Sequence, residues 1–133
     1  MNKKAFSLIE LIFVISILGI IASVAVPKLM DSRSGAIVTT IKQDITTIST
    51  AIESYYMLNN GISKIENSVH INKTVWKVSD KKIEYLTDDN TNLCLSLAVT
   101  NNKLVLNIDE NSQNKICQKL LSSGVVDFSH DLL

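Results

Sequence analysis

Glu10 is the residue whose charge most needs an explanation from its surroundings in the sequence. It lies in an apolar segment, residues 6–26, whose only other exceptions to hydrophobic character are three serines and one glycine. A carboxylate at membrane depth costs about 2.5–3.5 kcal/mol on insertion scales unless it lies near the interface or has a partner. Cutting the chain just before Phe6 would supply that partner as a new α-amino group. Glu10 could then pair with its own N-terminus or with that of a neighbouring subunit.

The apolar segment has the length of a membrane span. Its 21 residues, in a helix that rises about 1.5 Å per residue, cover about 31 Å. Lys3 and Lys4 precede it, so the positive-inside rule predicts a cytoplasmic N-terminus and places residues 28–133 across the membrane. An ordinary secretory signal cut near residues 22–25 is the alternative. It explains neither Glu10 nor the helical pattern that continues past that point.

Other residues that could do chemistry do not form a recognisable catalytic motif. His70 and His130 are far apart in the sequence, and G-x-S-x-G, G-x-G-x-x-G and P-loop patterns are absent. Two acidic clusters, residues 88–91 and 109–111, offer the oxygen ligands that Ca²⁺ prefers, but neither has EF-hand spacing. We therefore expect both clusters to be solvated turns, and we expect the protein to have no enzymatic activity, no metal site and no cofactor. Ca²⁺ is the one cation that such loops would suit.

Cys94 and Cys117 are the two cysteines of the chain. If residues 28–133 lie outside the cytoplasm, both thiols meet an oxidising compartment and can pair. The loop between them has 22 residues, for which chain-entropy arguments give a stabilisation of about 3 kcal/mol. Two separate buried thiols are the alternative.

The overall composition limits the remaining classes of function. The 133 residues suffice for one small domain plus an anchor. The 13 basic and 13 acidic residues balance, so the chain lacks the positive excess of an electrostatic nucleic-acid binder. With 4 glycines and 1 proline, neither low-complexity disorder nor a collagen-like repeat is expected.

A second helical pattern follows the apolar segment. Hydrophobic residues recur at spacings of three and four on one helix face, and they are Val38, Ile41, Ile45, Ile48, Ile52 and Tyr55. The helix is predicted to end at residues 59–61, where Gly61 is the usual kind of stop. The apolar stripe is expected to pack on a sheet of the same chain; a coiled-coil seam with another chain is the alternative.

The rest of the sequence is rich in strand patterns. Alternation predicts strands at residues 74–78 and 82–86 and a hairpin that pairs residues 93–99 with 103–108 across a turn at 100–102. Residues 113–122 indicate a short helix, and residues 125–133 a tail that begins as a strand. A long N-terminal helix laid on a small antiparallel β-sheet is an α+β fold.

The stretch KKAFSLIELIFVISILGIIASVAVP, residues 3–27, resembles the N-terminus of the type IV pilin superfamily, which includes pilins and type II secretion pseudopilins. The shared features are a basic leader, a small residue before a cut, an aromatic residue after it, a glutamate four residues later and a proline near the end of the apolar helix. Here these are Lys3, Lys4, Ala5, Phe6, Glu10 and Pro27. Ala5 departs from the glycine that is usual before the cut, although a small residue still fits the peptidase.

The resemblance implies a pilin-like fold with four segments: a cleaved leader (1–5), a transmembrane and assembly helix (6–27), an amphipathic helix of the head (28–60) and a β-rich globular head (61–133). Cleavage would fall between Ala5 and Phe6, and Phe6 would be N-methylated.

Five residues receive further roles from the same resemblance. Glu10 would neutralise the N-terminal amine of an adjacent subunit during assembly. Gly19 and Pro27 would bracket a stretch where the helix breaks or loosens within the filament. A bond between Cys94 and Cys117 would match the disulfide-bounded region of many pilins.

The function that the resemblance implies is that of a structural subunit of a type II secretion or competence pseudopilus, which supports protein secretion or DNA uptake. Its partners would be other pilin or pseudopilin subunits, the prepilin peptidase and an inner-membrane assembly platform, without direct nucleic-acid binding. The chain would cross the inner membrane once, with its head in the periplasm, before it joins a periplasmic pseudopilus or a surface filament. A major or minor type IV pilin is the alternative, and a membrane-anchored or secreted binding domain is an alternative from another class.

Overall fold

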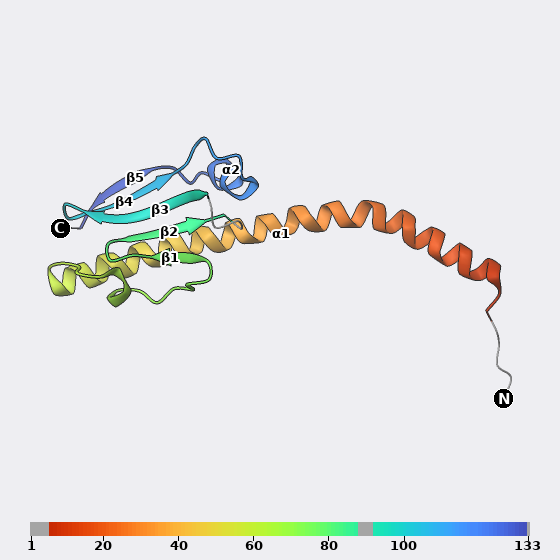
Figure 1. Ribbon diagram of the computed structural model, residues 1–133, viewed down its shortest axis with the longest axis horizontal. Helices are drawn as coiled ribbons and strands as arrows, with labels where there is room; N and C mark the ends of the chain where they lie inside the picture. Colours follow the sequence, from red (N-terminus) through yellow and green to blue (C-terminus); the bar gives the residue numbers. More distant parts are fainter. Residues whose placement is uncertain (1–5, 88–91, 133) are drawn as a thin grey trace, which may run out of the picture. The chain divides into compact units, whose positions relative to one another are not determined.

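The computed structural model describes residues 6–87 and 92–132. The predicted leader, with Ala5, and the first acidic cluster, residues 88–91, lie outside the described residues. In chain order the elements are helix α1 (Leu8–Asn59), the 3₁₀ turn η1 (Ile65–Asn67), strands β1 (Trp76–Val78), β2 (Lys82–Leu86), β3 (Leu93–Thr100) and β4 (Lys103–Ile108), helix α2 (Lys115–Ser122) and strand β5 (Phe128–Asp131) (Figure 1). Contacts divide the chain into two compact units with the boundary after Gly35.

The five strands form one antiparallel sheet in the order β1-β2-β3-β4-β5, so each strand pairs with its neighbour in sequence. The predicted hairpin is present, and its turn is made by Asn101 and Asn102, with φ of 50° and 60°. Asparagine tolerates this left-handed conformation, which two-residue hairpins favour because it matches strand twist. The chain tail adds β5, in which Phe128 lies opposite Leu106. The expected α+β fold is confirmed.

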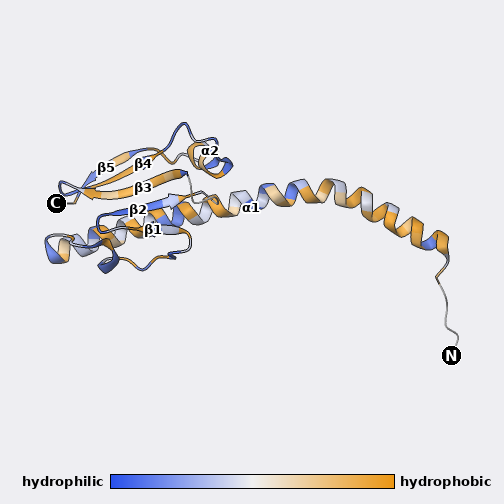
Figure 2. Cartoon of the chain, in the orientation of Figure 1, coloured by the Kyte–Doolittle hydropathy of each residue, from blue (hydrophilic) through white to orange (hydrophobic). Residues whose placement is uncertain are grey.

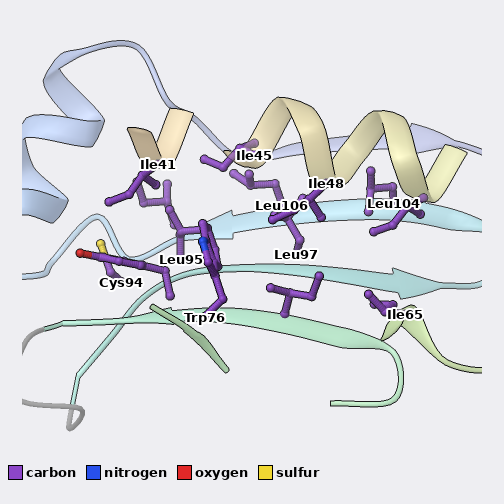
Figure 3. Close-up of a cluster of buried hydrophobic side chains, with 14 of the residues drawn as sticks. Ile41, Ile45, Ile48, Ile65, Trp76, Cys94, Leu95, Leu97, Leu104 and Leu106 are labelled. Atoms are coloured by element: carbon purple, nitrogen blue, oxygen red, sulfur yellow. The ribbon is translucent and has the colours of Figure 1, made fainter. Parts of the chain in front are cut away.

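The second half of α1 packs its apolar stripe on the sheet. The buried helix residues are Val38, Ile41, Ile45, Ile48, Ile52 and Tyr56. They join one hydrophobic cluster with sheet residues such as Leu95, Leu97, Leu104 and Leu106 (Figure 3). The predicted stripe is confirmed, and the stripe packs on the chain's own sheet as expected. Tyr56 occupies the last core position, while Tyr55 is only partly buried.

The end of α1 differs from the prediction in one detail. Asn60, rather than Gly61, adopts the positive φ that ends the helix, at 52°. Glycine is the usual residue at this position, but asparagine can replace it because its short polar side chain tolerates the left-handed region. After it, Ile62 and Ile65 are buried against the core, and the Ile65 N–H donates to the Asp80 carbonyl at 2.8 Å.

A polar contact fixes α1 to the first strand of the sheet. Trp76, which is 1 % exposed, donates from Nε1 to Oδ2 of Asp44 at 2.9 Å. A hydrogen bond to a charged group contributes about 1.5–3 kcal/mol, and a buried donor left without a partner costs about as much. Asp44 therefore orients Trp76 in the core and sets the register of α1 against β1.

Asp44→Ala is expected to lower the free energy of unfolding by about 1–3 kcal/mol, because it leaves the indole N–H buried and unbonded. Urea titration of the chain in detergent, followed by the fluorescence of its single tryptophan, measures the loss. Asp44→Asn is the matched control, since its amide oxygen still accepts, and it should lose clearly less. Equal losses from the two variants would contradict a role for this hydrogen bond.

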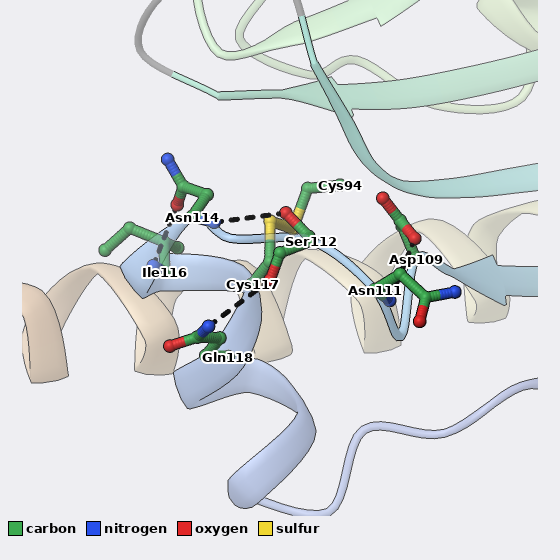
Figure 4. The surroundings of a disulfide bond; sticks show 8 residues. All are labelled: Cys94, Asp109, Asn111, Ser112, Asn114, Ile116, Cys117 and Gln118. Carbon is green, nitrogen blue, oxygen red and sulfur yellow. Dashed lines mark hydrogen bonds between the residues drawn. A yellow bond between two sulfur atoms is a disulfide. The ribbon is translucent and has the colours of Figure 1, made fainter.

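A disulfide joins the start of β3 to α2. Cys94 and Cys117 are bonded, and both are fully buried (Figure 4). Helix α2 is held independently at its N-terminus, where the Asn114 side chain accepts from the Ile116 N–H at 2.8 Å. At its other end, Lys42 of α1 donates to the Ser123 carbonyl at 2.9 Å. The disulfide thus secures a helix whose two ends are already capped.

Candidate functional site

In its described part, the first unit of the chain is a helix with no core of its own. Within residues 6–35, all large hydrophobic side chains are exposed in the single chain, and the hydropathy colouring is predominantly apolar along this half of α1 (Figure 2). The exposed residues are Phe6, Leu8, Ile9, Leu11, Ile12, Phe13, Val14, Ile15, Ile17, Leu18, Ile20, Ile21, Val24, Val26, Leu29 and Met30. Such a surface requires lipid or other apolar helices around it.

By length and composition, this helix can cross a membrane: its most apolar window has a mean hydropathy of 2.7. The two serines inside the span satisfy their hydroxyls locally. Ser16 donates to the Ile12 carbonyl and Ser23 to the Ile20 carbonyl, both at 2.7 Å. Since polar groups in hydrocarbon must find partners within the protein, these bonds let both serines face lipid or a neighbouring helix.

Glu10 is held at the first turn of α1. The Ser7 N–H donates to Oε2 of Glu10 at 3.1 Å, and the Leu11 N–H donates to the Ser7 carbonyl at 3.2 Å. Ser7 therefore stands at the N-cap and Glu10 at the third helical position, which is one half of a capping box. The negative charge also complements the positive end of the helix dipole.

The surroundings of Glu10 are apolar. Phe6, Ile9, Phe13 and Val14 line, together with Glu10, a shallow hollow of about 320 Å³. Within residues 6–87 and 92–132, no cation forms an ion pair with this carboxylate. The site combines an exposed acid and an apolar hollow, so a positively charged group flanked by apolar surface would fit it.

Helix α1 runs without interruption through Gly19 and Pro27. Proline removes one N–H from the helix ladder and crowds the preceding turn, so Pro27 weakens the helix even where it does not break it. The structure shows no break at either residue in the single chain. Loosening of the segment between them in an assembled filament stays a prediction.

The other residues considered for chemistry remain apart. His70 is exposed, and His130 lies 3.9 Å from the Glu53 carboxylate, from Nε2 to Oε1. Among the described residues, no three His, Cys, Asp or Glu side chains gather as a metal site. In the second acidic cluster, the Asp109 side chain accepts from the Asn111 N–H at 3.0 Å and so closes a turn.

Sequence reasoning missed the local role of Ser7. The signal was present, because S-L-I-E at residues 7–10 has the S-x-x-E spacing of a capping box. The spacing matters for function, since it gives Glu10 a structural task in addition to any role in pairing.

The N-terminus matches a family model described as the prokaryotic N-terminal methylation motif, over residues 1–26. The chain is similar to the type II secretion system core protein G of Pseudomonas aeruginosa, at 40% identity over 58 residues, which cover 44% of this chain and 41% of the relative. Core protein G of Pectobacterium carotovorum matches at 32% identity, over 51% of this chain and 44% of the relative. A fimbrial protein of Pseudomonas aeruginosa matches at 38%, over 39% and 34% respectively.

The chain spans less than half of the length of these relatives. No solved structure matches it. The resemblance to the type IV pilin superfamily, stated above from residues 3–27, is confirmed by the motif and by relatives of both the secretion and the fimbrial kind.

Proposed function

We propose that this chain, whose N-terminus carries the methylation motif of type IV pilins, is a structural subunit of a type II secretion or competence pseudopilus. Prepilin peptidase would cut it between Ala5 and Phe6, and Phe6 would then be methylated. The apolar half of α1 holds the subunit in the inner membrane until a neighbouring subunit takes the place of lipid. One repeated head-to-tail contact between identical subunits builds an open helical filament.

The observation that carries the proposal is the placement of Glu10. It is an exposed carboxylate on a helix whose neighbouring surface is apolar, and no described cation pairs with it. Buried without a partner it would be costly, and paired it tolerates a low dielectric. The N-terminal amine of Phe6 in an adjacent subunit has the required charge, and the apolar ring of Phe6 suits the hollow beside Glu10.

The pairing also explains how the acid selects register. Only one axial offset between two parallel helices brings the amine of one subunit to Glu10 of the other. Any other offset leaves two charges unpaired among apolar side chains, which is a penalty of several kcal/mol. Glu10 therefore acts as a positioning residue for assembly.

The head and its disulfide bear differently on the choice between a pseudopilus and a surface pilus. The described residues after Asn59 form one five-stranded sheet, one 3₁₀ turn and one short helix, and a head of this simple build favours a pseudopilus. The disulfide between Cys94 and Cys117 favours the alternative, a major or minor type IV pilin, because it bounds the C-terminal region as in many pilins. Both alternatives begin with the chain inserted in the inner membrane, with its N-terminus in the cytoplasm and its head on the other side. That compartment is oxidising, so a disulfide persists there.

Processing is the first test of this proposal. In membranes that contain prepilin peptidase, the chain is expected to begin at N-methyl-Phe6, and without the peptidase it should begin at its unprocessed N-terminus. Intact mass and N-terminal sequencing distinguish the two. Ala5→Gly is the matched variant, because it restores the residue usual before the cut and should be processed at least as fast.

Two outcomes would overturn the proposal. A mature chain that starts near residues 22–26 would identify an ordinary secretory signal. A chain left uncut in the presence of active peptidase, both with Ala5 and with Ala5→Gly, would identify a membrane-anchored domain that is not assembled.

A further inference from the structure

Asn60, which is exposed, and Gly61, which is half-buried, form a turn between α1 and the buried Ile62. From the geometry of this turn we propose that Asn60 is a site of spontaneous modification, at which the side-chain amide is lost and the residue becomes aspartate or isoaspartate. The reaction needs only water as a co-reactant. The proposal is independent of the filament function, because it depends on the head alone.

The step begins with attack by the backbone nitrogen of Gly61 on Cγ of Asn60. A new N–Cγ bond forms, the Cγ–Nδ2 bond breaks, and ammonia leaves with the proton of the attacking nitrogen. Water then hydrolyses one of the two imide bonds of the five-membered ring. Opening on one side gives aspartate, and opening on the other gives isoaspartate, whose side-chain carbon has entered the backbone.

The attacking nitrogen must be unhindered and unbonded, and this distinguishes Asn60 from its closest competitors. Three asparagines precede a glycine or serine, and they are Asn60, Asn67 and Asn111. The N–H that follows Asn67 donates to the Ile65 carbonyl at 2.9 Å, and the N–H that follows Asn111 donates to the Asp109 carbonyl at 3.3 Å. The Gly61 N–H makes no hydrogen bond to a described residue.

Glycine adds a second advantage at this turn. It has no Cβ to shield its nitrogen or to limit the backbone rotation that brings the nitrogen to Cγ. Open space surrounds Gly61, since a Cβ built there would meet nothing within 4 Å. Gly61→Ala is therefore a substitution that the fold tolerates and that slows the attack.

The product changes the end of α1. An aspartate or isoaspartate at residue 60 is ionised at neutral pH. It places a negative charge at the C-terminal end of a helix, where the dipole is already negative. Isoaspartate also lengthens the backbone between the helix end and Ile62, which is 9 % exposed and anchors the following loop. The aged chain should therefore lose stability in its head.

Peptide mapping of the full chain in detergent during prolonged incubation tests the proposal. The peptide that contains Asn60 should gain the mass difference between NH₂ and OH first, with aspartate and isoaspartate separated by chromatography. The decisive comparison is with the same chain in urea. Unfolding should accelerate the reaction at Asn67 and Asn111, whose attacking nitrogens are released, and leave the rate at Asn60 nearly unchanged.

Two variants complete the test. Gly61→Ala should slow the reaction at residue 60 severalfold without lowering the unfolding midpoint. Asn60→Asp should reproduce only the part of the lost stability that comes from the new charge, because it does not lengthen the backbone. The proposal is overturned if urea accelerates Asn60 as much as the other two sites. It is also overturned if the native chain reacts at Asn67 or Asn111 before Asn60.

Discussion

Glu10→Gln is expected to abolish or derail filament assembly while the head remains folded. The substitution removes the charge that would pair with a neighbouring N-terminal amine and leaves that amine unpaired in an apolar contact. Removal of one partner from a buried pair costs about 3–5 kcal/mol, which corresponds to roughly 10²–10⁴-fold in the affinity of each subunit contact. Filament yield in cells, measured by shearing or by crosslinking between subunits, is the readout.

Glutamine is chosen because it separates the two tasks of Glu10. The capping box accepts Glu or Gln at its third helical position, so Glu10→Gln can retain the hydrogen bond from the Ser7 N–H. Glu10→Ala removes both the charge and the cap. If the acid served only to cap α1, glutamine would assemble normally and alanine would not.

A matched control removes a carboxylate from the same helix elsewhere. Glu53→Gln lies in the second unit, where the side chain is partly buried near His130. It should leave assembly close to that of the unchanged chain. Processing of all variants at Phe6 must be verified first, because an uncut leader would block assembly for another reason. Normal filaments from processed Glu10→Gln subunits would refute the proposed pairing.

Local periodicity predicted the helical half of the core well. The stripe from Val38 to Ile52 follows directly from spacings of three and four, because one face of a helix that packs on a sheet must be apolar. The hairpin of β3 and β4 was equally accessible, since its strands alternate and its turn holds two asparagines. In both cases, adjacent residues encode the structure.

Features that depend on residues distant in sequence were not predictable in the same way. A strand in the tail was predicted, but its pairing was not: β5 has four exposed residues, and its partner is set by the edge that β4 offers. The hydrogen bond from Trp76 to Asp44 joins positions 32 apart. The burial of Ile62 and Ile65 likewise depends on where the core already lies.

For the candidate site, the sequence predicted the important residue and its local contact, but not its partner. The chemical anomaly of Glu10 is visible in sequence because an acid in an apolar run requires an explanation, and S-x-x-E spacing places its cap. What cannot be obtained from one chain is the partner, since in the proposed pairing the cation belongs to another subunit. The single chain accordingly leaves this carboxylate exposed.

Loss of the disulfide is expected to produce the largest change in the stability of the head. The bond closes a loop with a sequence separation of 23, for which chain entropy gives about 3 kcal/mol. The variant should combine Cys94→Ala with Cys117→Ala, so that no buried thiol is left without its partner. For a domain of this size, the midpoint of thermal unfolding should fall by roughly 10–20 °C.

The comparison of the reduced wild type with the double variant decides whether the bond or the packing matters. Both cysteines are fully buried, so each alanine also removes packing atoms. The reduced wild type keeps these atoms, so it loses the same packing only if its thiols move out of the core. Reduced wild type and the double variant should therefore agree within about 1 kcal/mol if chain entropy dominates. A double variant as stable as the oxidised chain would mean that the capped ends of α2 already restrict this region, and the disulfide would then serve to resist local opening rather than to stabilise the fold.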